Sequence, residues 1–384
     1  MYSSVCDMVM SRRSVCDMVM SRRFSILCLW LSLQLLSIVA DSSKNNCSAG
    51  GAGAAALARA QALEPPVPVS VYEGEDEDHT WWEAHEDLLK AARGEWGAKN
   101  AALYTFNEAF EKAFMEPVLR AAVDLAYSVA DDEEQLAAAE AKIRSLFSST
   151  AAPNVYRFRL FNHNFCEALL EELGHFEQSR IPMRRPNGMN RFGAVLDDLG
   201  LDSMLQAVVA KYVRPLAQVL YPEHAVDDDF AEHHGFVVRY RRRDGMPGDV
   251  KLAEHADAST VTLNMLLSDG GAGSGQGNGV AEFSGGKLLF GGLRFSDTEK
   301  QMERHGVDFE GEAPGMALLH LGQQKHAAGE LKWGERSNLI IWCFGKDGYV
   351  RTAAYDLAEQ PHPARRWGGA RGDDGSGSGH WGYL

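Results

Sequence analysis

Apolar residues recur at three- and four-residue intervals between about residues 81 and 147. This spacing places them on one face of a helix, because an α-helix turns once every 3.6 residues. The stretch 131–147, rich in Ala, Glu and Lys, has the same helical character. The periodic apolar positions include Leu88, Ala92, Trp96, Phe106, Phe110 and Phe114. We therefore predict a small helical region over residues 79–150.

After about residue 154, short strand-like runs become the dominant pattern. Residues 155–161 alternate as in a strand with one buried face, and 164–176 and 205–220 are predicted to be amphipathic helices. Apolar runs bounded by turn residues then predict strands. These runs are 235–240, 260–267, 287–290, 316–319 and 338–344. Helices followed by many short strands predict an α+β domain over residues 151–350, a β-sandwich or jelly roll covered by helices.

The N-terminal residues 1–40 are predicted to lie outside the folded domain. Residues 4–13 repeat as 14–23 in the form SVCDMVMSRR, and an apolar run at 24–40 follows two arginines. A basic segment before an apolar run is typical of a secretory signal peptide, and seventeen residues are also about enough for a membrane anchor. We expect either a cleaved signal or a single-pass anchor, and delivery to the lumen of the ER or Golgi.

Two further segments are also predicted to contribute little to the core. Residues 41–78 are Ala/Gly-rich, then Pro-rich, then acidic, which predicts a linker. Residues 351–384 form a Gly-rich, low-complexity tail. We therefore expect the folded part of the chain to lie between these two segments.

The charge of the chain limits its partners. With a formal net charge of -15, it is not expected to bind nucleic acid, whose phosphates carry the same sign. Six cysteines in 384 residues, none in a Cys-x-x-Cys pair, indicate neither a disulfide scaffold nor a structural zinc site.

The strongest chemical signal is His255-x-Asp257, followed at a distance by His326 and then Arg336. Residues i and i+2 of a strand point to the same face, so the pair is expected to direct an imidazole and a carboxylate to one spot. A further imidazole would complete a three-ligand group of the kind that holds non-haem Fe(II). His326 is favoured as that ligand, with His320 as the alternative. Arg336 opens an apolar run, where a buried cation needs an anionic partner.

Ordered motifs give the sequence a family resemblance. They lie at residues 186–201, 235–245, 254–267, 283–292 and 313–345, within a span of about 154–346. As a set, they resemble the 2-oxoglutarate- and Fe(II)-dependent dioxygenases. Within that superfamily the sequence is most similar to the prolyl/lysyl hydroxylase-like branch, and particularly to its oxygenase-domain-containing proteins of unassigned substrate.

The resemblance implies a double-stranded β-helix with His255, Asp257 and His326 as iron ligands. It also implies that Arg336 holds the distal carboxylate of 2-oxoglutarate and that Tyr240 lines the co-substrate pocket. No equivalent of a second hydroxyl partner for that carboxylate is evident in the sequence. The roles of these five residues are expectations that can be compared with the structure.

The implied activity is the use of O2 and 2-oxoglutarate to hydroxylate an unactivated C–H bond, with release of succinate and CO2. The expected substrate is a peptidyl prolyl or lysyl residue, and ascorbate dependence is a family expectation. Two alternatives remain open: an oxygenase acting on a small molecule, and a non-catalytic jelly-roll binding module.

Overall fold

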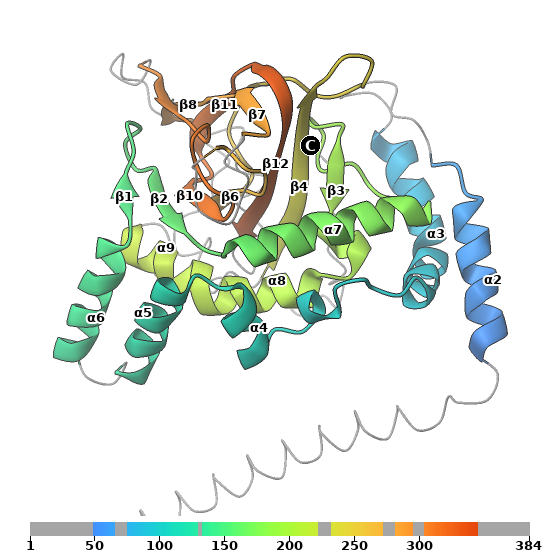
Figure 1. Ribbon diagram of the computed structural model, residues 1–384, viewed down its shortest axis with the longest axis horizontal. Coiled ribbons are helices and arrows are strands. Elements are labelled where there is room, and N and C mark those ends of the chain that lie inside the picture. Colours follow the sequence, from blue (N-terminus) through green and yellow to red (C-terminus); the bar gives the residue numbers. More distant parts are fainter. Residues whose placement is uncertain are drawn as a thin grey trace, which may run out of the picture.

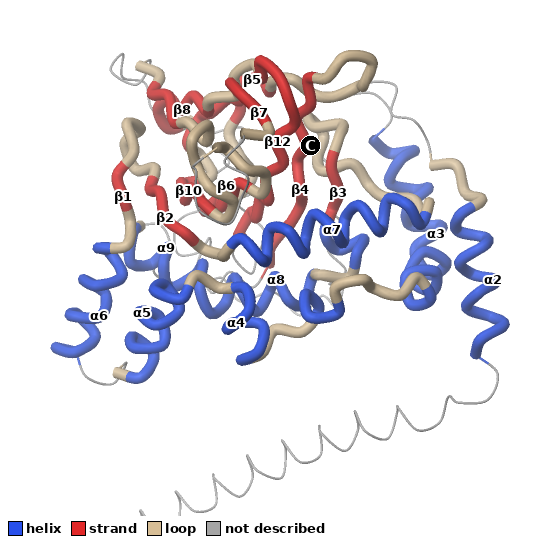
Figure 2. The backbone as a smooth tube through the Cα atoms, viewed as in Figure 1, coloured by secondary structure: helices blue, strands red, loops and turns tan. Residues whose placement is uncertain are grey.

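The strands form two antiparallel sheets that face each other, and the helices lie along the outer side of the larger sheet (Figures 1 and 2). This computed structural model describes residues 49–65, 75–129, 133–221, 232–271, 281–294 and 303–344. The predicted signal or anchor and the predicted tail lie outside the described residues. The arrangement confirms the expected α+β class.

The larger sheet has eight strands, and β12 is paired with three of them. In spatial order the sheet contains β1 (Ser148–Ser149), β2 (Tyr156–Arg159), β10 (Met316–Leu321), β6 (Val261–Leu266), β12 (Leu331–Phe344), β4 (Glu232–Arg242) and β3 (Gly193–Val195), while β7 (Phe283–Gly285) also pairs with β12.

The smaller sheet has four strands, which pair antiparallel like those of the larger one. In spatial order it contains β5 (Leu252–His255), β11 (Gln324–Ala328), β8 (Leu288–Leu293) and β9 (His305–Val307). Two facing antiparallel sheets with strands that alternate between them make the predicted double-stranded β-helix.

Side chains of the larger sheet alternate between two cores, as the two-residue period of a strand requires. On β12, Leu339 and Ile341 join the core under the helices, whereas Ile340 joins the core between the sheets. Val237 and Val238 of β4 divide in the same way. The polar side chains at the even-numbered positions of β12 therefore point between the sheets, where the site lies.

Two long helical segments cover the outer face of the larger sheet. The helix α7 (His163–Ser179) is capped at its N-terminus by Asn162, whose side chain accepts a hydrogen bond from the backbone N–H of Phe165. The second segment runs through α8 (Asp202–Val208), a π-helical turn η3 (Val209–Val213) and α9 (Arg214–Leu220). The apolar faces of these two segments pack against the outer face of the larger sheet, and together they form the main core.

The predicted N-terminal helical region is present and packs into the same core. Buried Phe110 and Phe114 contact Phe165 of α7 edge to face, which joins the two parts of the chain. Its elements are α3 (Glu75–Glu95), the 3₁₀ turn η1 (Ala101–Tyr104), α4 (Glu108–Phe114), α5 (Pro117–Ser128) and α6 (Glu133–Ser145).

The prediction of a linker over residues 41–78 is wrong for much of that segment. The helix α2 (Ala49–Gln61) packs against α3, and Ala60 is fully buried. The sequence was interpreted as flexible because of its glycines, but alanine has the highest helix propensity and its small side chain allows close packing.

No described helix has the length and hydrophobicity needed to cross a membrane. The apolar run at 24–40 lies outside the described residues.

Candidate active site

His255 and His326 lie directly opposite each other on the neighbouring strands β5 and β11. Their ring centroids are 4.3 Å apart. Each ring is held through Nδ1, which lies 2.9 Å from a carbonyl oxygen of its own strand, that of Ala253 or Gln324. Because a carbonyl oxygen only accepts, both Nδ1 atoms carry the proton and both Nε2 atoms present a lone pair.

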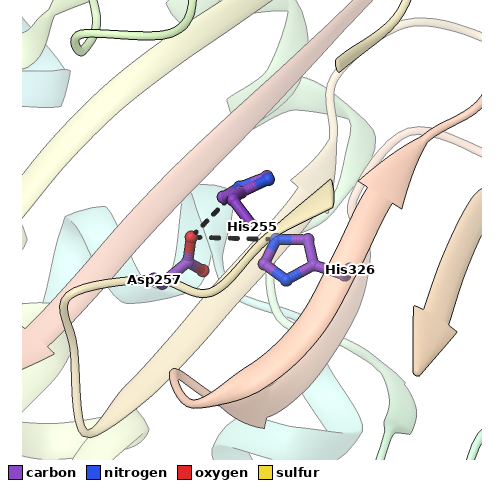
Figure 3. Close-up of side chains that lie close together, drawn as sticks. All are labelled: His255, Asp257 and His326. Carbon is purple, nitrogen blue, oxygen red and sulfur yellow. Dashed lines mark ion pairs between the residues drawn. The ribbon is translucent and has the colours of Figure 1, made fainter. Parts of the chain in front are cut away.

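Asp257 completes the group from a position beyond the end of a strand. The strand β5 ends at His255, so the prediction of two residues on one strand face is wrong. Asp257 lies in the following turn, where its backbone N–H donates to the carbonyl of Gly322 at 2.8 Å. Its Oδ1 lies 3.4 Å from Nε2 of His255 and 3.7 Å from Nε2 of His326 (Figure 3). The turn therefore brings the carboxylate to the imidazoles.

The second oxygen of Asp257 has a partner of its own. The hydroxyl of Thr262 on β6 donates to Oδ2 at 2.6 Å, and Ser259 lies 2.8 Å from that hydroxyl. This bond leaves Oδ1 facing the imidazoles and fixes the orientation of the carboxylate. Hydrogen bonds to ligand side chains of this kind orient metal ligands in proteins.

These three side chains fit a divalent iron ion. Their ligand atoms all lie within 4.8 Å of one another, and two imidazole nitrogens with one carboxylate oxygen are the donor set of non-haem Fe(II) sites. Burial lowers the pKa of His326 to about 3, so its ring is neutral and able to bind a metal. Burial opposes ionisation of Asp257, but the two imidazoles hold its pKa well below the usual range.

His320, the alternative ligand, lies behind the group rather than in it. Its ring is fully buried, with its centroid 4.8 Å from the ring of His326, and its Nδ1 lies 3.0 Å from the carbonyl of Leu321. It is not one of the three side chains that the structure brings together. The geometry thus places His326, and not His320, beside His255 and Asp257.

Arg336 lies in the middle of β12, five residues after the start of that strand, with only 1% of its surface exposed. Its Nη1 donates to the carbonyl of Gly286, and its guanidinium lies over the ring of Tyr240, 4.8 Å from the centroid. Within the described part of the chain, no carboxylate forms an ion pair with it. Burial lowers its pKa from the usual value, which expresses the cost of a desolvated cation without an anion.

Gly286 makes room for that guanidinium. Its φ of +74° suits glycine, and a Cβ at this position would lie 2.8 Å from Nη1 of Arg336. The carbonyl of the same residue accepts the hydrogen bond. The turn before β8 is therefore shaped around Arg336.

Comparisons with known proteins agree with this geometry. A family model described as the OGFOD2-like domain matches residues 94–226. The 2-oxoglutarate and iron-dependent oxygenase domain-containing protein ICU11 of Arabidopsis thaliana is 40% identical over 197 residues, 50% of this chain and 45% of that protein. The human 2-oxoglutarate and iron-dependent oxygenase domain-containing protein 2 is 36% identical over 221 residues, 56% of this chain and 55% of that protein. Over about half of its length, the chain is similar to proteins named as 2-oxoglutarate and iron-dependent oxygenase domain-containing proteins.

This chain spans about half the length of those relatives. A more distant match is the human procollagen-lysine,2-oxoglutarate 5-dioxygenase 1, which is 27% identical over 184 residues, 46% of this chain and 22% of that protein. The resemblance inferred from the ordered motifs is confirmed at the level of the family.

The pocket beside His255 is lined by residues of both sheets. Tyr240 of β4 lies opposite Arg336 in the register of the larger sheet, and both side chains line the pocket. The amide of Asn190 donates to the Tyr240 hydroxyl at 3.4 Å. The loop at residues 181–192 therefore contributes to the pocket, which was not predicted from the sequence.

Several other pocket residues were missed, although the sequence carried a signal for them. Thr262 and Asn264 are polar residues two apart in the apolar run of β6, and Asn338 and Trp342 are four apart in β12. Asn338 donates to the side chain of Asn264 at 2.8 Å, between the sheets. Polar residues that share one face of an otherwise apolar strand point to a lined pocket, because burial of an unpaired polar group is costly.

Proposed function

We propose that the chain is an Fe(II)- and 2-oxoglutarate-dependent dioxygenase that hydroxylates an unactivated C–H bond. The observation that supports this most directly is Arg336, a buried guanidinium without a carboxylate partner among the described residues, in the pocket that His255, Asp257 and His326 also line. Such a cation needs an anion, and the distal carboxylate of 2-oxoglutarate would accept two parallel hydrogen bonds from it.

The residues divide the work between them. His255 and His326 would bind the iron through Nε2 and Asp257 through one carboxylate oxygen, which leaves about three positions for the co-substrate and O2. Bound iron supplies the redox chemistry that activates O2 while 2-oxoglutarate is converted to succinate and CO2. Thr262 holds Asp257 in orientation, and Arg336 with Tyr240 fixes the far end of the co-substrate. Apolar side chains such as Phe236 and Ile340 exclude water from the pocket.

A peptidyl prolyl or lysyl residue is the substrate that we propose. The support is the distant relative whose name states that it acts on procollagen lysine. A small-molecule substrate and a binding module without catalysis are the competing functions, and the assay below distinguishes them.

The test uses the full chain with Fe(II), 2-oxoglutarate, O2 and ascorbate, the last included because we propose the same reductant dependence as in the family. We expect succinate, and a mass gain of one oxygen atom on members of a panel of proline- and lysine-containing peptides. Asp257→Ala should abolish both products, whereas Glu171→Gln, at an exposed residue of α7, should not.

Each outcome of the assay has a distinct meaning. Succinate that forms without any peptide product, but rises with a small molecule that gains oxygen, would favour the small-molecule function. Absence of both succinate and iron binding in the folded wild-type chain would overturn the enzyme proposal and favour the binding module.

We also propose that the protein enters the secretory pathway. The support is the sequence of residues 24–40 and the glycosylation pattern Asn46-Cys47-Ser48. Expression in a eukaryotic cell should give a glycan on Asn46 that a glycosidase removes. A cytosolic chain without this glycan would contradict the proposal.

A further inference from the structure

A second group of potential metal ligands lies on the opposite face of the larger sheet from the iron ligands. It contains Asp197 of the 3₁₀ turn η2 (Leu196–Leu199), Asp202 at the start of α8 and His233 of β4. One ligand atom from each lies within 4.8 Å of the other two. Successive residues of a strand face opposite ways, so His233 points to the helices while its neighbour His234 points between the sheets.

His233 presents an unpartnered nitrogen to this group. Only 3% of its side chain is exposed, and its Nδ1 lies 2.7 Å from the amide oxygen of Gln206. Because that oxygen only accepts, Nδ1 carries the proton and Nε2 has a free lone pair. Among the described residues, Nε2 has no hydrogen-bond partner, and it lies 3.5 Å from Oδ1 of Asp202. Two acceptors thus face each other, and the described part of the chain provides no donor between them.

Asp197 adds a third acceptor. Its Oδ1 is buried and has no hydrogen-bond partner in the described ranges, and burial together with the nearby charge of Asp202 raises the pKa of its carboxyl to about 7. The guanidinium of Arg93 donates to the backbone carbonyl of Asp197, and Arg184 is paired with Asp198 at 2.7 Å. These interactions leave the buried oxygen without a donor. A cation or a proton is needed there.

We propose that Asp197, Asp202 and His233 form a second metal site, which binds a divalent transition metal such as Zn²⁺. One imidazole nitrogen with carboxylate oxygens suits Zn²⁺ better than Ca²⁺ or Mg²⁺, which prefer sets of oxygen ligands. The side chain of Asp202 is 59% exposed, so ions can enter and water can complete the coordination.

The role of this site is structural. It connects the turn η2 and the start of α8 to the first residues of β4, so a bound ion would fix the helical layer on the larger sheet. It lies on the face of that sheet away from the pocket and carries no part of the oxygenase chemistry. A site of this kind stabilises the native chain, because the unfolded chain does not present the three ligands together.

The test measures Zn²⁺ binding to the full chain carrying His326→Ala, which disables the first group of ligands. Elemental analysis after dialysis should give one Zn²⁺ per chain, and calorimetric titration gives the Kd. Adding Asp202→Asn should raise the Kd at least tenfold, because a carboxylate ligand becomes a neutral amide. Glu171→Gln, which removes another exposed carboxylate from a helix, is the matched control and should leave the Kd unchanged.

A second measurement guards against a folding defect. Zn²⁺ should raise the Tm of the His326→Ala chain, and this rise should be lost with either Asp202→Asn or the isosteric Asp197→Asn, each checked for native circular dichroism. Absence of bound Zn²⁺ in the His326→Ala chain would overturn the proposal. An unchanged Kd in both Asp variants would overturn it as well, and would mean that a proton occupies the space between the three acceptors.

Discussion

The two faces of the larger sheet carry similar ligands in different surroundings. On the inner face, two imidazoles and one carboxylate lie beside a pocket, and the side chain of Asp257 is only 3% exposed. On the outer face, one imidazole and two carboxylates lie between a strand and a helix, and the side chain of Asp202 is 59% exposed. The ligand types alone therefore do not indicate whether a group is suited to catalysis.

The surroundings make the difference. Inside, every ligand is held by a second interaction, and Arg336 provides a place for an anionic co-substrate next to the metal ligands. Outside, His233 is held by Gln206, but none of the three ligands is among the residues that line the pocket of Arg336. Catalysis needs open coordination positions next to a bound substrate, whereas structural binding needs only the ligands.

The largest expected effect comes from removing an inner ligand. His326→Ala should lower 2-oxoglutarate turnover on the order of 1,000-fold or more, because residues that act as one unit fail together. His320→Asn should retain stoichiometric iron, since that ring lies behind the group. Succinate release and iron content measure both effects. The reverse pattern would show that His320 is the third ligand.

The outer group should control how stability depends on pH in metal-free protein. Asp197 has a pKa of about 7, compared with 3.8 for a free side chain, so its contribution to stability is full below about pH 4 and is lost as the pH rises through 7. The difference corresponds to at most about 4 kcal/mol. Asp197→Asn should remove this dependence. Urea unfolding at pH 5 and pH 8 measures the free energy of unfolding of both chains. If this free energy changes with pH in the Asp197→Asn chain as much as in the wild type, the assignment is contradicted.

Arg336→Lys tests the anion site of the inner face. Lysine keeps the charge but cannot offer two parallel N–H donors, so the KM for 2-oxoglutarate should rise about 100-fold, with a smaller effect on kcat. Arg241→Lys, at a partly exposed residue paired with Glu335 at 2.6 Å, is the matched control. Steady-state kinetics decides, and an unchanged KM would mean that Arg336 does not bind the co-substrate.

Thr262→Val should have the smallest effect. It removes the hydroxyl that donates to Asp257 while it keeps the shape of the side chain, so iron affinity should fall about tenfold. Thr262→Ser retains a hydroxyl and should restore much of the affinity. Competition with a chelator measures the iron affinity of both variants. Equal affinity in the Val and Ser variants would show that the hydrogen bond to Asp257 does not contribute to iron binding.

The sequence indicated which residues share the pocket better than it indicated the backbone structure around the metal ligands. Arg336 and Tyr240 were predicted to share a pocket, and the structure places them opposite each other on β12 and β4. Asp257 was expected on a strand but lies in a turn, because a two-residue spacing does not show where a strand ends. The Ala/Gly-rich segment was expected to be a linker, but packing against α3 stabilises it as a helix.

The sequence by itself determined which faces of the strands are buried and that the chain resembles the 2-oxoglutarate- and iron-dependent oxygenases, because alternation and ordered motifs are local properties. Only the tertiary structure decided that His326 rather than His320 meets His255, since this depends on the pairing of β11 with β5. It also brought Asp197 and Asp202 to His233, across a gap of more than thirty residues. Strand register and helix packing, which join distant residues, are not encoded in any single segment.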